Sequence, residues 1–447
     1  MNDPALWLPI FTLVTAGLTA LFLRLAMRAL RRGRLVDDLP TSKTAGVFIG
    51  LVECHGTAES EAPFTSFLAE VRCVHHAWSV DEHWQRTVTE TYTDSKGNTQ
   101  TRTRTESGST TVASGGESAP FWLRDDTGVV QVDPDKSDLR CKRVFQENVR
   151  RSDPLYYGKG PTRSVADSTH RRTFTEYAIP LHHELYVIGR SQLDEEATAP
   201  LIAHDPESPL FVISTQGEES VSKGYVWGLR GWTLLALLTN FGAVFTLFAS
   251  MAELDGPRLD PAGADLPLFV TVSVLLFVLV WTLCWIWQVY NALVGLRQRS
   301  LRGDSLIDIE LERRSDLIPR LVEIVKAMAD HEQETQAALA RMRSQARATD
   351  ASATEAVGLA SDLRMVVERH PDLKSNQLFS DLQDRLVDTE DRIARARAYA
   401  NELGANYNTR LEVVPDRWVA ALAKLRPRPM FAVDAFERRA VTVDLAD

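Results

Sequence analysis

Residues 266–289 read LPLFVTVSVLLFVLVWTLCWIWQV, with no charged side chain among them. A helix that rises about 1.5 Å per residue crosses a hydrocarbon core of about 30 Å with roughly this many residues. Two further stretches are apolar enough to do the same, at about residues 5–23 and 232–251. The sequence therefore predicts a membrane protein with three transmembrane helices and soluble parts between and after them.

Basic residues flank these three stretches unevenly. Five arginines follow the first stretch at 24–34, Lys223 and Arg230 precede the second, and three arginines follow the third at 297–302. The loop between the second and third stretches carries four acidic residues and one arginine. Short basic flanks stay in the cytoplasm. We therefore expect the N-terminus and the acidic loop to lie outside and both soluble parts to lie in the cytoplasm.

A cleavable signal peptide is the alternative interpretation of the first stretch. Its start, Met1-Asn2-Asp3-Pro4, is acidic rather than basic. No small-residue cleavage pattern precedes the arginines, which is unlike a secretory signal. Insertion without cleavage explains the arginine cluster better.

Charge and cysteine content exclude several kinds of site. The net charge of −10 argues against a nucleic-acid partner, which requires a basic surface. The four cysteines are scattered and form no CxxC pair, so we expect no thiolate zinc site. They lie at Cys54, Cys73, Cys141 and Cys284.

The first soluble part, residues 35–225, has the pattern of a β domain. Its short runs are rich in β-branched and aromatic residues, and turn residues separate most of them. These runs lie at 45–54, 71–80, 120–124, 129–132, 174–179, 185–190 and 210–215. Residues 88–117 differ, because Thr, Ser, Gly and charged residues dominate them. They form either a two-stranded ribbon or a disordered loop, and we predict a mobile ribbon.

Two motifs in this part are similar to a known domain. PFWLRDDTGVVQVDP at 120–134 suits a strand, a tight turn and a returning strand, and LYVIG at 185–189 suits a buried strand. Their order and spacing resemble the GIDE domain, also called BAM, of membrane-anchored ubiquitin ligases and their bacterial relatives. The resemblance implies a small β-barrel like an OB-fold.

Ligase activity does not follow from this resemblance. In the ligases, catalysis belongs to a RING domain after the second span, which needs about eight Cys and His ligands for two zinc ions. This chain has a helical pattern there instead. We therefore predict a non-enzyme and keep a ligase-like transferase as the alternative function.

The C-terminal part carries three motifs of high specificity. RRSDLIP at 313–319, HPDLKSN at 370–376 and TEDRIARAR at 389–397 resemble the LemA family. Departures include His370 for a usual Tyr and Gly303-Asp304 for a usual Ala-Trp. The resemblance implies an antiparallel helical bundle hung from a transmembrane helix, with no settled activity. Apolar residues at helical spacing over 307–329, 356–367 and 379–407 agree with it. We expect short breaks at about 349–352 and at Pro371. Pro319 should kink its helix or begin a new one, because it lacks an N–H.

One pair of charged residues interrupts the apolar faces of this bundle. Arg314 falls in line with Leu311 and Ile318, and Glu390 falls in line with Leu386 and Ile393. A charge on the core side must be paired or hydrogen-bonded. We therefore predict an Arg314–Glu390 pair that fixes the helix register. Asp308 and Asp372 are alternative partners, and a ligand cleft lined by these groups is the functional alternative.

No other residues form a catalytic, cofactor or metal site by pattern. The pairs His75-His76 and His182-His183 can each offer at most one side chain to a site, because neighbours in a strand face opposite ways. We predict solvated histidines, with metal binding or pH sensing as the alternative. The second and third spans offer few polar groups, so a transporter component is a weaker alternative.

Together these patterns predict an α+β membrane protein of four parts. They are a first transmembrane helix with its basic flank (1–34), a GIDE-like β domain (35–225), two transmembrane helices (226–290) and a LemA-like bundle with a tail (291–447). The leading function is a non-catalytic scaffold, and the resemblance to LemA proteins implies a bacterial inner membrane and a role in envelope maintenance or signalling. Its expected partners are the lipid bilayer and unidentified proteins. Gly242 and Ala243 allow close helix approach, either in a homo-oligomer or within one chain.

Overall fold

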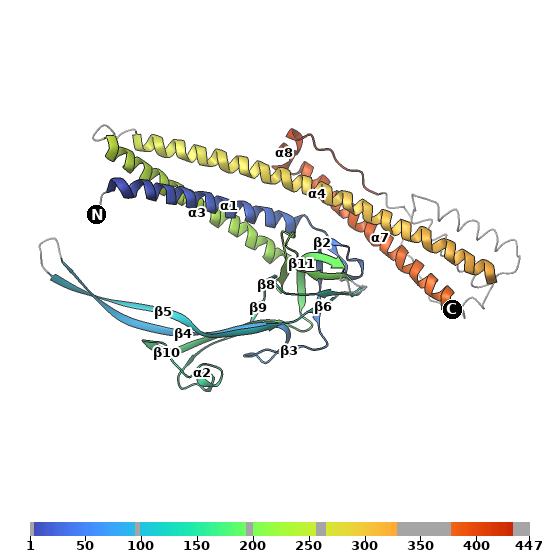
Figure 1. Cartoon of the computed structure of the whole chain (residues 1–447), viewed down its shortest axis with the longest axis horizontal. Coiled ribbons are helices and arrows are strands. Elements are labelled where there is room, and N and C mark those ends of the chain that lie inside the picture. Colours follow the sequence, from blue (N-terminus) through green and yellow to red (C-terminus); the bar gives the residue numbers. More distant parts are fainter. Residues whose placement is uncertain (1–3, 94–98, 194–199, 256–264, 329–376, 432–447) are drawn as a thin grey trace, which may run out of the picture. The chain divides into compact units, whose positions relative to one another are not determined.

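The computed structural model describes residues 4–93, 99–193, 200–255, 265–328 and 377–431 (Figure 1). The chain divides into two compact units. One is Thr41–Trp227, and the other combines Met1–Pro40 with Gly228–Asp447.

The first unit contains a closed five-stranded barrel. Its strands run in the order β2–β6–β7–β12–β11, and β11 pairs back with β2. Neighbours are antiparallel except β7 and β12, which are parallel. This is the Greek-key arrangement of an OB-fold, so the predicted small barrel is confirmed. The strands are β2 (Gly50–Glu59), β6 (Phe121–Arg124), β7 (Val129–Val132), β11 (Glu184–Leu193) and β12 (Pro200–Ala203).

Inward-facing residues at every second position fill the barrel. They include Val52, Cys54, Leu123, Val130, Val132, Leu185, Val187 and Ile202, each at most 2% exposed. Gly56 permits the close approach of β2 and β6, because a Cβ there would lie 2.4 Å from the carbonyl oxygen of Arg124. Three short strands extend the sheet beyond the barrel: β1 (Thr41–Ser42), β8 (Asp138–Arg140) and β13 (Val212–Ser214).

Asp125 holds the turn between β6 and β7. Its carboxylate accepts hydrogen bonds from the main-chain N–H groups of Thr127, Gly128 and Thr44. Burial raises the pKa of this carboxyl, but hydrogen bonds from Thr44 and Thr127 outweigh it and lower the pKa to about 2. A short polar side chain that satisfies nearby N–H groups is the usual device of such a turn.

A second sheet is formed by strands that are not part of the barrel. Its path is β3–β4–β10–β9, and β5 pairs with β4. The strands are β3 (Phe64–Thr65), β4 (Arg72–Thr93), β5 (Thr99–Ser118), β9 (Lys142–Arg150) and β10 (Ser168–Pro180), and a short helix α2 (Pro154–Gly158) follows β9. Strand β10 follows β4 only as far as Trp84, after which β4 and β5 pair with each other alone. The described part of residues 88–117 is therefore paired as a two-stranded ribbon.

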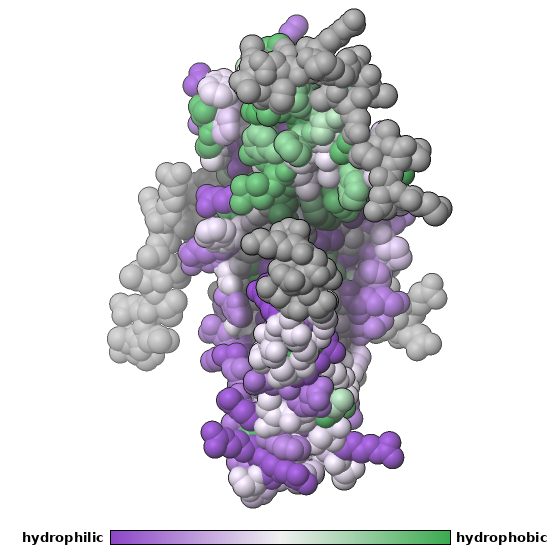
Figure 2. Space-filling view, turned by 90° about the vertical axis from the view of Figure 1, so that its left-hand side faces the viewer, coloured by the Kyte–Doolittle hydropathy of each residue, from purple (hydrophilic) through white to green (hydrophobic). Residues whose placement is uncertain are grey.

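Among the described residues, three helices are long and apolar enough to cross a membrane. They are α1 (Pro4–Asp37), α3 (Gly217–Asp255) and α4 (Asp265–Met328). Figure 2 shows hydrophobic side chains gathered in one broad area of the surface. On these helices, Leu13, Phe245 and Leu275 are each more than half exposed. Exposed apolar area of this extent marks contact with lipid or protein.

Hydrogen bonds between these helices fix their directions. Thr12 bonds Thr246, and Thr19 bonds Thr239, so α1 and α3 are antiparallel. The amide of Asn240 donates to Ser273, and Phe248 meets Phe269 edge-on, so α3 and α4 are antiparallel as well. A Cβ on Gly242 would lie 3.8 Å from Thr15, which places this glycine against α1 of the same chain.

Helix α4 extends well beyond the third apolar stretch. We expected the stretch at 266–289 to run straight into a charged helix, and Pro319 to kink that helix or begin a new one. Helix α4 runs without interruption from Asp265 to Met328 with Pro319 inside it, so no new helix begins at Pro319. Its apolar first half and amphipathic second half share one hydrogen-bonded rod, because nothing in the sequence between them breaks a helix.

Two further helices pack on the second half of α4. They are α7 (Gln377–Glu412) and α8 (Asp416–Leu422). Their shared core includes Leu293, Leu296, Leu403, Tyr407 and Val419. A Cβ on Gly303 would lie 3.2 Å from that of Ala400, so the two long helices approach closely there. The breaks expected at 349–352 and at Pro371 lie outside the described residues. So do Asp372 and the apolar stripe expected between these two breaks.

Candidate functional site

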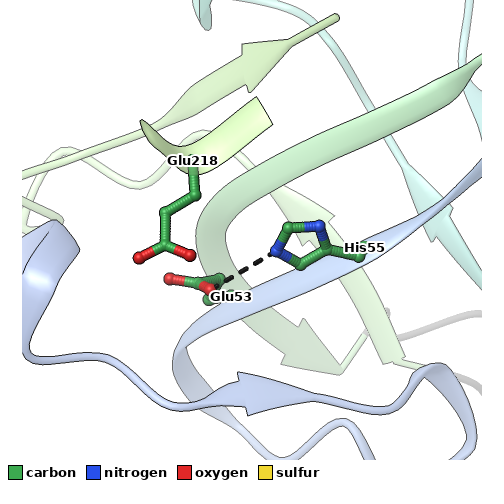
Figure 3. Close-up of side chains that lie close together, drawn as sticks. All are labelled: Glu53, His55 and Glu218. Atoms are coloured by element: carbon green, nitrogen blue, oxygen red, sulfur yellow. Dashed lines mark ion pairs between the residues drawn. The ribbon is translucent and has the colours of Figure 1, made fainter. Parts of the chain in front are cut away.

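Three side chains of the first unit gather acid and imidazole groups on the barrel. Glu53 and His55 lie two positions apart on β2 and so face the same side, and Glu218 lies in the first turn of α3. One ligand atom from each lies within 4.8 Å of the others. Figure 3 shows the two carboxylates and the imidazole turned toward one another, with Nε2 of His55 3.6 Å from Oε1 of Glu53.

The buried member of this cluster is already hydrogen-bonded. Glu53 is 1% exposed. The hydroxyl of Tyr186 donates to its Oε2 at 2.9 Å, and the hydroxyl of Thr41 donates to its Oε1 at 3.0 Å. The ring of His55 meets that of Tyr186 edge-on at 5.0 Å. The carboxylate therefore joins strands β1, β2 and β11 at the edge of the barrel.

The donor types of this cluster are those that zinc accepts from proteins. His55 and Glu218 are exposed, however, and Glu53 is satisfied by two hydroxyl groups without any ion. We therefore assign the cluster a structural role. We expected no metal site from the sequence, and Glu218 could not be linked to Glu53 by spacing because the two lie far apart in the chain.

Only the first of the two histidine pairs lies in a strand, because His182 and His183 lie in the turn between β10 and β11. The prediction of solvated histidines is wrong for His76, which is 5% exposed. In the first pair, Nδ1 of His76 lies 3.4 Å from the carboxylate of Glu176, while His75 bonds Ser118. Burial, with the neighbouring His76, lowers the pKa of His75. In the second pair, His182 lies 2.9 Å from Glu59. Neither pair converges with a third ligand among the described residues.

Glu176 stabilises the loop between β3 and β4. Its carboxylate accepts three main-chain N–H groups, from Phe67, Leu68 and Ala69, at 2.7–3.0 Å. The side chain is 0% exposed. It therefore fastens the loop between β3 and β4 to β10.

In the second unit, the structure brings Arg314 and Glu390 together. Nε of Arg314 on α4 lies 2.7 Å from Oε1 of Glu390 on α7. The side chain of Arg314 is 3% exposed and that of Glu390 is 22% exposed. The contact is an ion pair without hydrogen-bond alignment at these two atoms. Burial raises the pKa of Glu390, and Arg314 opposes that rise.

A second group of charges joins the end of α1 to α7 and α8. Arg34 donates two hydrogen bonds to the carboxylate of Asp416, at 2.7 and 2.8 Å. Arg410 donates to Asp38 at 2.7 Å. Both aspartates are at most 3% exposed. Burial raises the pKa of Asp38, and Arg410 works against it. Sequence patterns do not reveal these pairs, because their members lie more than 370 positions apart.

Comparison with known families assigns both soluble parts. Residues 304–445 match the LemA family, and residues 89–246 match GIDE, described as E3 Ubiquitin ligase. The chain joins a GIDE domain to a LemA domain. Both resemblances seen in the sequence are therefore confirmed. No curated protein matches the chain significantly.

The GIDE and LemA matches cover different elements of the structure. The GIDE match begins within β4, includes every barrel strand except β2, and ends within α3. The LemA match covers residues 304–328 of α4 and all of α7 and α8. Arg314 and Glu390 lie inside the LemA domain, and Glu176 and Glu218 lie inside the GIDE domain.

Proposed function

We propose that this chain is a non-catalytic membrane scaffold that holds a GIDE domain and a LemA domain on the cytoplasmic side of a bilayer. The observation that carries the proposal is the alternation of α1, α3 and α4. In such a trio, the end of α1, the beginning of α3 and the second half of α4 emerge on one side. The pairs Arg34–Asp416 and Asp38–Arg410 support this placement, since they link the end of α1 to the LemA helices.

The choice of side rests on charge. Arginines follow the first and third apolar stretches, and acidic residues fill the loop between the second and third. Short basic flanks stay in the cytoplasm. Both domains would then face cytoplasmic partners, and the exposed apolar surface of the three helices would face lipid.

Cysteine labelling in intact cells tests the orientation. In a chain without its native cysteines, a cysteine at Ala262 should react with an impermeant reagent, because the acidic loop is expected outside. Cysteines at the exposed positions Ser109 and Ala421 should react only after the membrane is opened. Labelling of Ser109 in intact cells would overturn the orientation. Labelling of only one of Ser109 and Ala421 would overturn the common side.

The absence of catalysis is supported by thiol chemistry. Burial raises the pKa of Cys54 and of Cys141 to about 12, and that of Cys73 to about 11. The thiolate is the nucleophile, and at neutral pH these groups are almost entirely protonated. After residue 251 the sequence has only Cys284, His331 and His370 as candidate zinc ligands, too few for a RING.

The description of the GIDE family favours a ligase-like transferase as the second candidate. A transfer assay separates the two functions. The purified full chain, supplied with charged conjugating enzyme, should transfer no ubiquitin under conditions in which a known RING ligase does. Transfer that disappears in Cys54→Ala, Cys73→Ala or Cys141→Ala would establish an enzyme in place of a scaffold.

A further inference from the structure

After α8 the chain continues along the LemA helices without forming a helix or strand of its own. We call residues 425–431, LRPRPMF, the strap. Pro427 and Pro429 bias the residues before them toward extended conformations. Met430 and Phe431 remain 57% and 42% exposed, so the end of the strap is not part of the apolar core.

Two asparagines of α7 bind the main chain of the strap. The amide of Asn408 donates to the carbonyl of Arg428 at 2.9 Å and accepts the N–H of Arg428 at 2.8 Å. The amide of Asn401 donates to the carbonyl of Phe431 at 3.1 Å and accepts its N–H at 2.7 Å. Each asparagine therefore satisfies both main-chain groups of one residue, as a neighbouring strand would.

The spacing of these asparagines selects an extended ligand. Asn401 and Asn408 are seven residues apart on a helix, which separates them by about 10 Å. Three residues of polyproline-type chain, from Arg428 to Phe431, span about 9 Å at 3.1 Å each. The same three residues in a helix would span about 4.5 Å and could not reach both asparagines.

One side chain of the strap is also recognised. The guanidinium of Arg428 donates to Oγ of Ser300 at 2.7 Å and pairs with Asp304, both on α4. The hydroxyl of Tyr407 donates to the carbonyl of Arg426 at 3.2 Å. Asp304 supplies the negative charge that Arg428 pairs with.

We infer that Ser300, Asp304, Asn401, Tyr407 and Asn408 form a peptide-binding face. Its ligand is an extended segment with an arginine between two prolines, and the strap of the same chain occupies the face in cis. The contacts engage the ligand's main chain and one arginine, so a separate peptide of this chemistry can make all of them. The inference rests on the scaffold proposal only in naming what the LemA domain of such a scaffold would bind.

A labelled peptide of residues 424–432 tests the face on the full chain in mild detergent. A tethered segment competes at a millimolar effective concentration, so the parent should bind the peptide weakly. Arg428→Glu in the chain removes the donor to Ser300 and places a carboxylate beside Asp304, which should release the strap. Peptide binding should then become at least about tenfold tighter.

Further variants show whether binding occurs at this face. In the Arg428→Glu chain, Asn401→Ala with Asn408→Ala should weaken peptide binding at least about tenfold, because both main-chain contacts are lost. Asn406→Ala, on the same helix but outside the strap contacts, is the matched control and should change nothing. A peptide with glutamate in place of its central arginine should not bind.

Two outcomes would overturn the inference. One is equal peptide binding by the parent and the released chain, and the other is binding that survives loss of both asparagines. If Arg428→Glu lowers the helix content, Pro427→Gly with Pro429→Gly loosens the strap without a charge change and should give the same increase. The measurement needs neither bilayer orientation nor ubiquitin chemistry, so its failure and that of the scaffold proposal are distinguishable.

Discussion

Replacing Arg314 with Met should lower the free energy of unfolding by about 3 kcal/mol, the lower end of the range for breaking a buried ion pair. The lower end applies because Glu390 keeps 22% exposure and the two closest atoms are not aligned as a hydrogen bond. An exposed pair would contribute about 0–1 kcal/mol. Unfolding of the full chain in mild detergent, followed by circular dichroism, measures the difference.

The double variant and a neighbouring arginine provide the controls. Adding Glu390→Leu to Arg314→Met should recover much of the loss, because no buried charge is then left unpaired. Arg313→Met should cost less than about 1 kcal/mol, since Arg313 is 46% exposed and lies 3.9 Å from Glu310. If both single variants at 314 and 390 unfold like the parent, these charges are solvated and do not fix the register.

The loss from Arg314→Met should also depend on pH. Burial already raises the pKa of Glu390 above its ordinary value, and Arg314 opposes that rise. Without Arg314 the pKa rises further in the folded state only. A raised carboxyl pKa favours the folded state at low pH, and that contribution is lost as pH increases through the folded pKa. The destabilisation should therefore be smaller at pH 5 than at pH 8.

Helical periodicity predicted the pair of Arg314 and Glu390. The faces of α4 and α7 follow from apolar residues every three or four positions, and Arg314 and Glu390 each stand within such a row. Both charges need a partner, and this requirement restricts how α4 and α7 can be aligned. The same reasoning could not find the strap, because Asn401 and Asn408 bind a main chain and leave no apolar pattern.

Strands were harder to predict from the sequence than helices. Four of the five barrel strands were predicted, because apolar residues recur at alternate positions, as in β6 and β7. The fifth, β12, has only the four residues PLIA and was missed. Strand β9, with the sequence KRVFQENVR, was missed because a largely exposed strand at the edge of a sheet needs few apolar residues. Contacts across a sheet also depend on register, which a single sequence does not specify where both faces carry polar residues.

Arg172 and Glu82 illustrate this limit. They lie directly opposite each other in β10 and β4, and both are 0% exposed. Arg172 donates to Glu82 at 3.0 Å and to the carbonyls of Tyr156, Pro161 and Arg163 at 2.7–3.1 Å. Its guanidinium also lies 3.9 Å from the centre of the Tyr156 ring. The arginine therefore holds the segment after β9 against the second sheet.

Glu82 depends on the same network. It accepts the hydroxyl groups of Tyr156 and Ser168 besides the guanidinium of Arg172. Burial raises the pKa of Glu82, but these hydrogen bonds outweigh it and lower the pKa below its ordinary value. A lowered pKa contributes stability above the unfolded value that is lost as pH falls. Folding therefore stabilises the charged form of Glu82.

We expect Arg172→Met to cost about 5 kcal/mol, more than Arg314→Met, because it leaves a buried carboxylate and three buried carbonyls without their donor. A loss of that size approaches the whole stability of many domains, about 5–15 kcal/mol. Arg172→Lys should recover little, since one ammonium group cannot reproduce the planar set of donors. Chemical unfolding of the full chain, followed by tryptophan fluorescence, measures these losses, with the exposed neighbour variant Arg171→Met as the near-neutral control.

The double variant distinguishes this network from an isolated ion pair. Adding Glu82→Leu to Arg172→Met removes the unpaired charge, but the carbonyls of Tyr156, Pro161 and Arg163 still lack a donor. Each unsatisfied buried group costs about 1–3 kcal/mol, so only a minor part of the stability should return. Full recovery in the double variant would mean that Arg172 serves Glu82 alone, and the segment after β9 would then be held by other contacts.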